Sequence, residues 1–188
     1  MPIPSRALTR LRLTALSAAV CLLASIGLLA SPAHAAGVLD TTCTPPSSST
    51  TTYSPPLTLT PQPSSSTLSY QFGPCVSLSQ PAVTSGTSTR TNPASSRSCL
   101  DLLGVSAGTL TITWNTGQTS TLSVNVTSTR AGAALVVTQT GTVTSGLFAG
   151  DTVVITQTGP AADVLLCTAG LGTVPSIYGL LTLEITSV

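Results

Sequence analysis

Residues 109–127 read TLTITWNTGQTSTLSVNVT, and this stretch decides the fold. On either side of its centre every second residue is apolar, which is the pattern of a strand with one buried face. The apolar positions are Leu110, Ile112 and Trp114 before the centre, and Leu122, Val124 and Val126 after it. Residues 115–118 between them are typical of a turn. The stretch therefore predicts an antiparallel hairpin, with Trp114 anchoring the core.

Strand-like sequence continues towards the C-terminus. Residues 135–144 and 151–158 are rich in β-branched side chains, and residues 181–186 alternate again, which places Glu184 on a solvent-facing side. Seven or eight strands separated by turns predict an all-β fold, namely an antiparallel immunoglobulin-like β-sandwich with one or two short helical turns. A small open β-barrel is the alternative, because alternation is the same in both architectures.

One local similarity suggests two neighbouring strands. Residues 136–141 read VVTQTG, and residues 153–159 read VVITQTG. Two strands of one hairpin share the same β-preference, so this echo predicts hairpin partners and no duplicated domain.

The part of the chain before residue 67 has a different composition. Residues 36–66 are rich in Ser, Thr and Pro, and prolines lack the amide donor that a central strand requires. This N-terminal segment is therefore expected to hold only an edge strand or an extended loop, and whether residues 44–66 are ordered stays open. Residues 67–188 form the body of the sandwich, and 36–188 together make a single domain.

The first thirty-five residues have the three parts of an export signal. Arg6, Arg10 and Arg12 precede an apolar run at residues 13–29, and the small-x-small pattern ends at Ala35. Cleavage is expected between Ala35 and Ala36, and the rival interpretation is a retained membrane helix. The N-terminus holds no arginine pair. We therefore expect export by the general secretion route and an extracellular protein, with no membrane attachment after cleavage.

Four cysteines remain after the signal, namely Cys43, Cys75, Cys99 and Cys167. An even number in an exported chain predicts two disulfides. Three pairings are possible, and we favour Cys43 with Cys75 and Cys99 with Cys167. The first pair meets if residues 43–53 run antiparallel to residues 68–75.

The second pair follows from two predicted helical turns. Ser98 and Asp101 have the spacing of a capping box, so Asp101 is expected to be a cap and not a catalyst. Residues 160–167 read as another short helix, with Asp163 near its first turn. A disulfide between Cys99 and Cys167 would join the two turns.

Charge excludes several classes of partner. Residues 36–188 contain no histidine and no lysine, and five acids against three arginines leave them at formal net charge −2. No basic patch is present in the sequence, so neither nucleic acid nor an anionic membrane surface is an expected partner.

The one motif that suggests catalysis is GVSAG at residues 104–108, which matches a nucleophile elbow with Ser106 at its centre. A serine nucleophile needs a neighbouring base, and residues 36–188 offer neither His nor Lys. An acid pair for glycoside cleavage stays open among the four aspartates and Glu184, although few aromatics are available to bind a sugar. We expect no enzyme, no cofactor and no metal site.

Several segments together resemble a known group. They are residues 53–61, Pro74-Cys75, residues 98–103, residues 112–120 and residues 146–151. The chain is similar in them to an uncharacterised family of small secreted β-rich proteins of actinomycetes. The resemblance implies an exported β-rich domain and supplies no site residues.

The function expected from these observations is a non-catalytic extracellular module that acts in a surface, in a matrix or in binding. Its partner would be an extracellular protein or a cell-wall glycan. One alternative is an inhibitor of extracellular proteases, which needs a rigid exposed loop, and residues 74–97 are the candidate. The other alternative is a glycan-binding module.

Overall fold

The computed structural model describes residues 37–188, which belong to one compact unit. Its strands are β1 (Leu39–Cys43), β2 (Ser48–Leu57), β3 (Gln62–Phe72), β4 (Cys75–Ser77), β5 (Gly86–Arg97), β6 (Gly104–Trp114), β7 (Thr119–Ala131), β8 (Ala134–Gly146), β9 (Thr152–Pro160) and β10 (Val174–Thr186). Its helices are η1 (Cys99–Leu102) and α2 (Ala162–Thr168). The all-β class is confirmed. The export signal and the bond between Ala35 and Ala36 lie outside the described residues.

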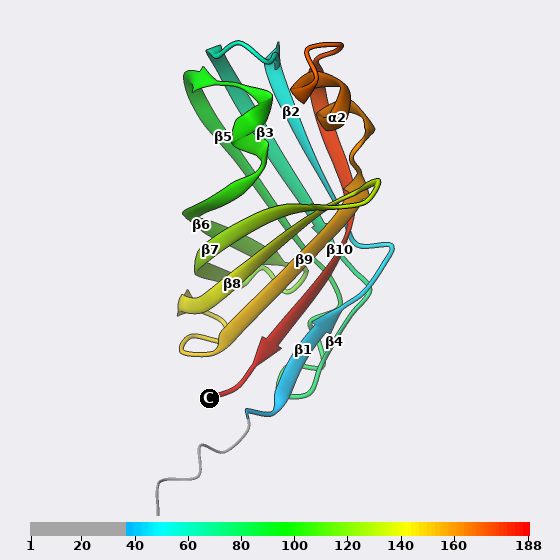
Figure 1. Ribbon diagram of the computed structural model, residues 1–188. Coiled ribbons are helices and arrows are strands. Elements are labelled where there is room, and N and C mark those ends of the chain that lie inside the picture. The colour runs from blue at the N-terminus through cyan, green and yellow to red at the C-terminus, as the bar shows by residue number, and fades with distance from the viewer. Residues whose placement is uncertain (1–36) are drawn as a thin grey trace, which may run out of the picture. The chain divides into compact units, whose positions relative to one another are not determined.

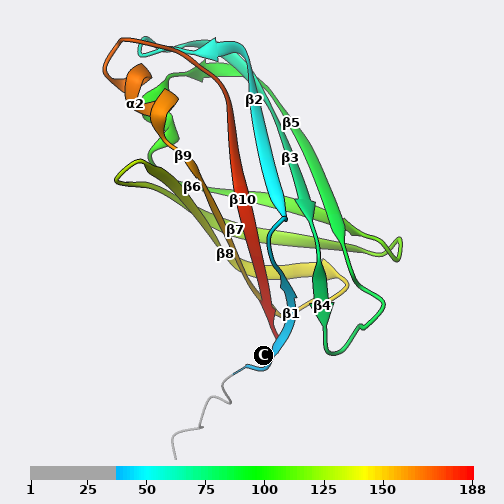
Figure 2. The same cartoon turned by 90° about the vertical axis from the view of Figure 1, so that its right-hand side faces the viewer.

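Eight of the strands close on themselves to form a barrel. Their order is β2-β3-β5-β6-β7-β8-β9-β10, and β10 pairs back onto β2. Figure 1 shows β6 to β9 lying across β2, β3 and β5, and Figure 2 shows how steeply the two groups cross. The predicted immunoglobulin-like sandwich is therefore wrong, and the alternative, a β-barrel, is the architecture of the chain.

The ring closes because one edge of β10 pairs with β2. The same edge also pairs with β1 further along the strand. Its residues 174–180 pair with β2, and its residues 183–186 pair with β1. On the opposite edge β9 pairs with residues 180–186. β1 is in turn paired with β4, so these two short strands extend the sheet beyond the ring.

The Ser/Thr/Pro-rich segment 36–66 contributes more than the predicted edge strand, and that expectation is wrong. β2 is paired on both sides, with β3 and with β10. Pro55 lies where the register between β2 and β10 is irregular, so its missing N–H removes no ladder bond. The carbonyls of Pro55 and Ser54 accept hydrogen bonds from the hydroxyls of Ser64 and Ser65 instead. Serine side chains thus bind backbone carbonyls at the end of the β2–β3 pairing.

The hairpin at residues 109–127 is confirmed as β6 and β7, which pair from Gly104–Ser128 to Thr113–Thr119. Trp114 is 2% exposed, and its ring meets Phe148 edge-on with centroids 5.7 Å apart. The echoed segments pair as β8 and β9, as expected for hairpin partners.

Two apolar clusters fill the interior. The larger one surrounds Trp114 and includes Phe72, Ile112, Leu122, Val143, Ile155 and Leu183. The smaller one lies beside η1 and α2 and comprises Leu57, Cys99, Leu135, Ala161, Val164, Cys167 and Val174. The barrel interior between them is not filled by apolar side chains alone, and this is where the candidate site lies.

Two disulfides are present, joining Cys43 to Cys75 and Cys99 to Cys167, which is the favoured pairing. The first lies where β1 and β4 are paired, and the second connects η1 to α2. At the start of η1, Asp101 Oδ2 accepts hydrogen bonds from the Ser98 amide at 2.7 Å and from its hydroxyl at 3.0 Å. Asp101 is therefore a cap, as predicted. No helix within residues 37–188 is long and apolar enough to cross a membrane.

Candidate functional site

The ring is held closed between β5 and β6 at one narrow junction. Within the described residues only two pairs join these strands, Gly86 with Trp114 and Thr87 with Thr113. A Cβ added at Gly86 would lie 2.8 Å from both Trp114 Cε3 and Ile112 Cγ2. A residue without a side chain is thus needed for β5 to approach β6 so closely.

A cavity of about 450 Å³ lies in the barrel, and every strand of the ring contributes to its wall. Its leucine, valine and isoleucine lining residues belong to the two clusters or pack against them, so the cavity lies between the two. They are Leu57, Leu68, Leu102, Leu110, Val124, Val126, Leu135, Val137 and Ile177. This volume is within the range of pockets that hold small organic ligands.

The cavity reaches the surface between β5 and β6. Beyond the junction, β5 continues along β3 and β6 runs along β7. Exposed residues of both strands, Arg90 on β5 and Ser106 on β6, line the same cavity as the buried residues of the lumen. Arg90 spans this mouth, because its Nη1 donates a hydrogen bond to the Thr109 carbonyl at 3.0 Å.

Two buried glutamine amides face the lumen. Gln139 on β8 is 4% exposed, and its Nε2 donates to the hydroxyl of Tyr70 on β3 at 3.2 Å. Gln157 on β9 is 6% exposed and also lines the cavity, and its amide is not among the buried side-chain groups that lack a hydrogen-bond partner in residues 37–188, which are Thr41 Oγ1 and Ser49 Oγ. Gly179 on β10 leaves room for it, since a Cβ there would lie 2.6 Å from Gln157 Cγ. An amide on the wall of an open cavity can form a hydrogen bond with a polar group of a ligand in place of water.

Two tyrosine hydroxyls lie in the same cavity and hold their protons strongly. Burial raises the pKa of Tyr53 to about 12, although the positive charge of Arg97 opposes the rise. Burial also raises the pKa of Tyr70, against the opposing effects of the Gln139 hydrogen bond and the charge of Arg90. Both phenols are therefore neutral near pH 7 and can donate a hydrogen bond to a ligand.

A bulge in β5 brings its polar residues to one face. The register against β3 shifts between Asn92 and Ser95, where β5 has one more residue than β3. Arg97 comes seven positions after Arg90, and this odd offset would place the two on opposite faces of a regular strand. The extra residue places both arginines and Asn92 in the cavity wall. Arg97 Nη1 and Asn92 Nδ2 each donate to Ser66 Oγ at 3.1 Å.

The GVSAG motif forms no nucleophile elbow. Ser106 lies within β6, in a continuous strand, and not at a turn between a strand and a helix. It lines the mouth of the cavity, near the capping residue Asp101. Residues 37–188 contain no histidine and no lysine, which already argues against catalysis by this motif, and the structure does not give Ser106 the strand-turn-helix setting that the motif requires.

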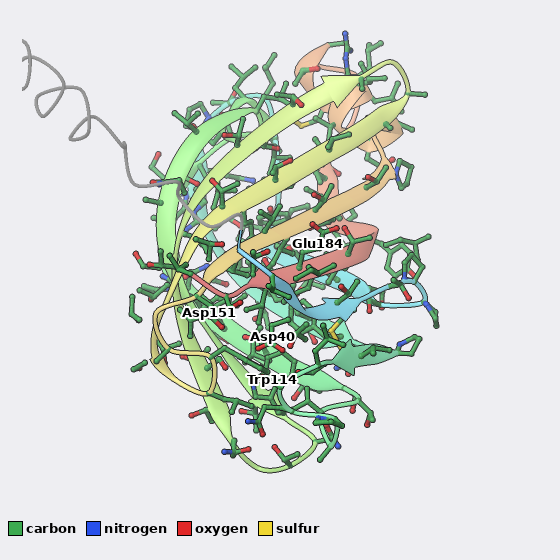
Figure 3. The ribbon with its side chains drawn as sticks, turned by 90° about the horizontal axis from the view of Figure 1, so that it is seen from below. Asp40, Trp114, Asp151 and Glu184 are labelled. Atoms are coloured by element: carbon green, nitrogen blue, oxygen red, sulfur yellow. A yellow bond between two sulfur atoms is a disulfide. The ribbon has the colours of Figure 1, made fainter. Side chains whose placement is uncertain are left out.

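The other acids lie away from the cavity. Asp40 accepts hydrogen bonds from Ser79 N at 2.8 Å, Ser79 Oγ at 2.6 Å and Ser77 Oγ at 3.3 Å. Burial alone would raise its pKa, but these bonds together with one from the Leu78 backbone outweigh burial and hold it below 3.8. Figure 3 shows Asp151 on the same side of the barrel as Asp40, with Glu184 apart from both. Among residues 37–188 no group of three or more such side chains could hold a metal ion.

The candidate inhibitory segment, residues 74–97, is not a single free loop. Its first residues form β4, and its last twelve form β5, a wall of the barrel. The exposed connection between them comprises residues 78–85, of which Val83 is buried.

No protein-family model, no curated protein and no solved structure matches this chain. The class that the fold and the cavity define is a small antiparallel β-barrel with a partly polar lumen open at its side. The resemblance to secreted actinomycete proteins stays a prediction.

Proposed function

We propose that the protein is a non-catalytic extracellular binding module that holds a small molecule in the lumen of its barrel. The observation that carries this proposal is the cavity of about 450 Å³, whose mostly apolar wall includes the inward-facing amides of Gln139 and Gln157. A barrel interior built only for stability would be filled by side chains, because close packing of apolar groups is stabilising. A bound ligand would fill the cavity and form hydrogen bonds with the amides of its wall.

The polarity of the wall supports a ligand of mixed character. Nine aliphatic side chains surround the lumen, while hydroxyl and amide groups come from Tyr53, Tyr70, Gln139 and Gln157. Mostly apolar pockets with a few placed polar groups are typical of small-molecule sites. Entry between β5 and β6 requires no movement of the hairpin turns.

Secretion belongs to the same proposal. Two disulfides are typical of proteins that work in oxidising surroundings outside the cell. They join β1 to β4 and η1 to α2, so they stabilise elements at the margins of the barrel and leave the mouth between β5 and β6 unbridged.

A neutral fluorescent probe tests the proposal without presupposing the charge of the ligand. Nile red is titrated against residues 36–188, and we expect saturable binding at one site with a blue-shifted emission. Val126→Phe and Val137→Phe fill the lumen and should weaken binding at least about tenfold, equivalent to about 1.4 kcal/mol.

The matched control is Val154→Phe, which adds the same ring on an exposed position of β9 outside the cavity. Circular dichroism and melting temperature show whether each variant is folded. If the folded lumen variants bind as the wild type does, or if the wild type does not bind, the proposal is wrong. Protease inhibition and glycan binding stay predictions, and assays against a protease panel and on insoluble glycans test them.

A further inference from the structure

Positive charge is concentrated at the mouth of the cavity. Of the three arginines in residues 37–188, Arg90 and Arg97 line the cavity, and Arg130 does not. Residues 36–188 carry a formal net charge of −2, so the positive charge at the mouth is opposite in sign to the net charge of this part of the chain. An anionic group is attracted to such a site even when the whole molecule is negative.

The two guanidinium groups keep donors for a ligand. Arg90 uses Nη1 for the Thr109 carbonyl, and Arg97 uses Nε for Ser95 Oγ and Nη1 for Ser66 Oγ. These acceptors are all uncharged oxygens. Within residues 37–188 no protein atom accepts a hydrogen bond from Nη2 of either arginine. The charge of each arginine is therefore satisfied only in part.

The Arg97 side chain extends back towards Arg90. Arg97 is opposite Gln62 on β3, yet its Nη1 reaches Ser66, which is opposite Asn92. Leu68, the β3 partner of Arg90, is only two residues from Ser66 along β3. The Arg97 guanidinium therefore lies two residues along the strand from the level of Arg90. Arg97 and Tyr53 both line the cavity, and the positive charge of Arg97 lowers the pKa of the Tyr53 hydroxyl against the larger effect of burial.

The charged side chains at the mouth sum to +1, which matches a ligand with a single negative charge. Asp101 lines the same region, and its carboxylate is held by Ser98. Two arginines and one aspartate leave one positive charge, which a carboxylate balances. A phosphate monoester, which carries about −1.5 to −2 at pH 7, would exceed it and face Asp101.

From this juxtaposition we infer that the ligand is an amphipathic carboxylic acid, with its carboxylate on Arg97 and beside Arg90 and its apolar body in the lumen. This inference rests on the proposed function, since it names the chemical class that the same cavity accepts. Guanidinium and carboxylate form strong charge-assisted hydrogen bonds, and the nine aliphatic side chains of the wall provide the apolar surroundings for the body.

Displacement of Nile red by three molecules with one alkyl chain tests the inference. Decanoic acid, decan-1-ol and decyl phosphate are compared at pH 7.5, each below its micelle concentration. We expect decanoate to displace the probe at least about tenfold more tightly than the alcohol, about 1.4 kcal/mol. It should also bind more tightly than the phosphate.

Substitutions identify the residues. Arg97→Gln should abolish the preference for acid over alcohol, and Arg90→Gln should reduce it about threefold. Arg130→Gln removes the same charge away from the cavity and should leave the preference unchanged. Because the alcohol serves as reference in every variant, a loss of fold would lower both affinities and would not imitate a loss of preference.

The outcomes separate this inference from the proposed function. If the alcohol and the acid displace the probe equally in the wild type, the lumen binds ligands but the inference is wrong. If the phosphate binds most tightly, the charge argument is wrong. If Arg130→Gln reduces the preference as much as Arg97→Gln does, the mouth is not the anionic subsite. If Nile red itself does not bind, the proposed function fails first.

Discussion

Gln139 on β8 donates a hydrogen bond to the Tyr70 hydroxyl on β3, 3.2 Å away, across the lumen between two strands that are not neighbours in the ring. Both residues are almost fully buried. The bond spans the barrel at the cavity, where apolar packing is interrupted. It therefore fixes the distance between opposite walls at the place where a ligand would bind.

Removing the phenol oxygen tests this bond. Tyr70→Phe should lower the free energy of unfolding by about 1 kcal/mol, because the Gln139 amide loses its partner. Gln139→Leu should cost a similar amount, and the double variant should cost less than the sum of the two. Urea denaturation measures all three. Additive effects would contradict a direct interaction.

Because β5 and β6 are so close at Gly86, we expect one added methyl group there to lower the stability of the protein strongly. Gly86→Ala places a Cβ 2.8 Å from the Trp114 ring and should destabilise the protein by about 1–3 kcal/mol. Gly108→Ala on β6 is the matched control, since its Cβ would meet only the end of Arg90, at 3.4 Å. Thermal unfolding checks both, and equal costs would mean that the junction tolerates a wider separation.

Ser120 connects two buried polar groups. Its hydroxyl accepts from Trp114 Nε1 at 2.8 Å and donates to the Leu147 carbonyl at 2.6 Å. Ser120→Ala leaves both without this partner and should cost about 1–3 kcal/mol in the free energy of unfolding. Ser123→Ala, at an exposed position of the same strand, should change it by less than about 0.5 kcal/mol. A small effect at Ser120 would mean that water replaces the hydroxyl.

Stability should depend on pH mainly at the extremes. No side chain in residues 36–188 has an ordinary pKa between about 5 and 8, so we expect a flat free energy of unfolding there. Tyr53 retains its proton to about pH 12 when folded and to about 10 when unfolded, so its stabilising contribution is complete below pH 10 and lost as the pH rises towards 12. Melting temperatures measured from pH 5 to pH 11 check this, and Tyr53→Phe should reduce the alkaline loss.

The ionised carboxylate of Asp151 should destabilise the folded state at neutral pH. Burial raises its pKa first, the charge of Asp40 raises it further, and a hydrogen bond from the Val188 backbone opposes both. A raised pKa means that the folded state favours the protonated form, so this group stabilises the fold at low pH and ceases to do so once it ionises. Asp151→Asn should therefore raise the melting temperature at pH 7. Glu184→Gln, at an exposed position, controls for the change in net charge. A lower melting temperature for Asp151→Asn alone would contradict the sign.

The strands that could be predicted from sequence are those whose buried face is apolar. β6 and β7 alternate cleanly around Trp114, and the paired cysteines Cys43 and Cys75 could be placed from the antiparallel return of the chain. β5 has no such pattern, because its inward positions include Gly86, Arg90 and Asn92, so its residues suggested a loop. Alternation also reports only which face is buried. It does not report whether a sheet closes on itself, so the barrel could not be separated from a sandwich.

The candidate site was missed for a related reason. Gln139 and Gln157 occupy equivalent places in the echoed segments VVTQTG and VVITQTG, and both face the lumen. The repeated segment correctly indicated a hairpin. It also contains a glutamine at an inward-facing position in each of the two neighbouring strands, and this pattern could have indicated the site. Arg97 gave no such signal, because it shares a face with Arg90 only through the bulge in β5.

The two residue pairs between β5 and β6 also affect how the protein behaves at high concentration. Because only two residue pairs join β5 to β6, the rest of each strand does not pair with the other along the mouth, and parting of the junction would lengthen these unpaired edges. Such edges accept strands from a second molecule, so self-association would begin here. The close fit between Gly86 and the Trp114 ring thus limits how far these edges extend.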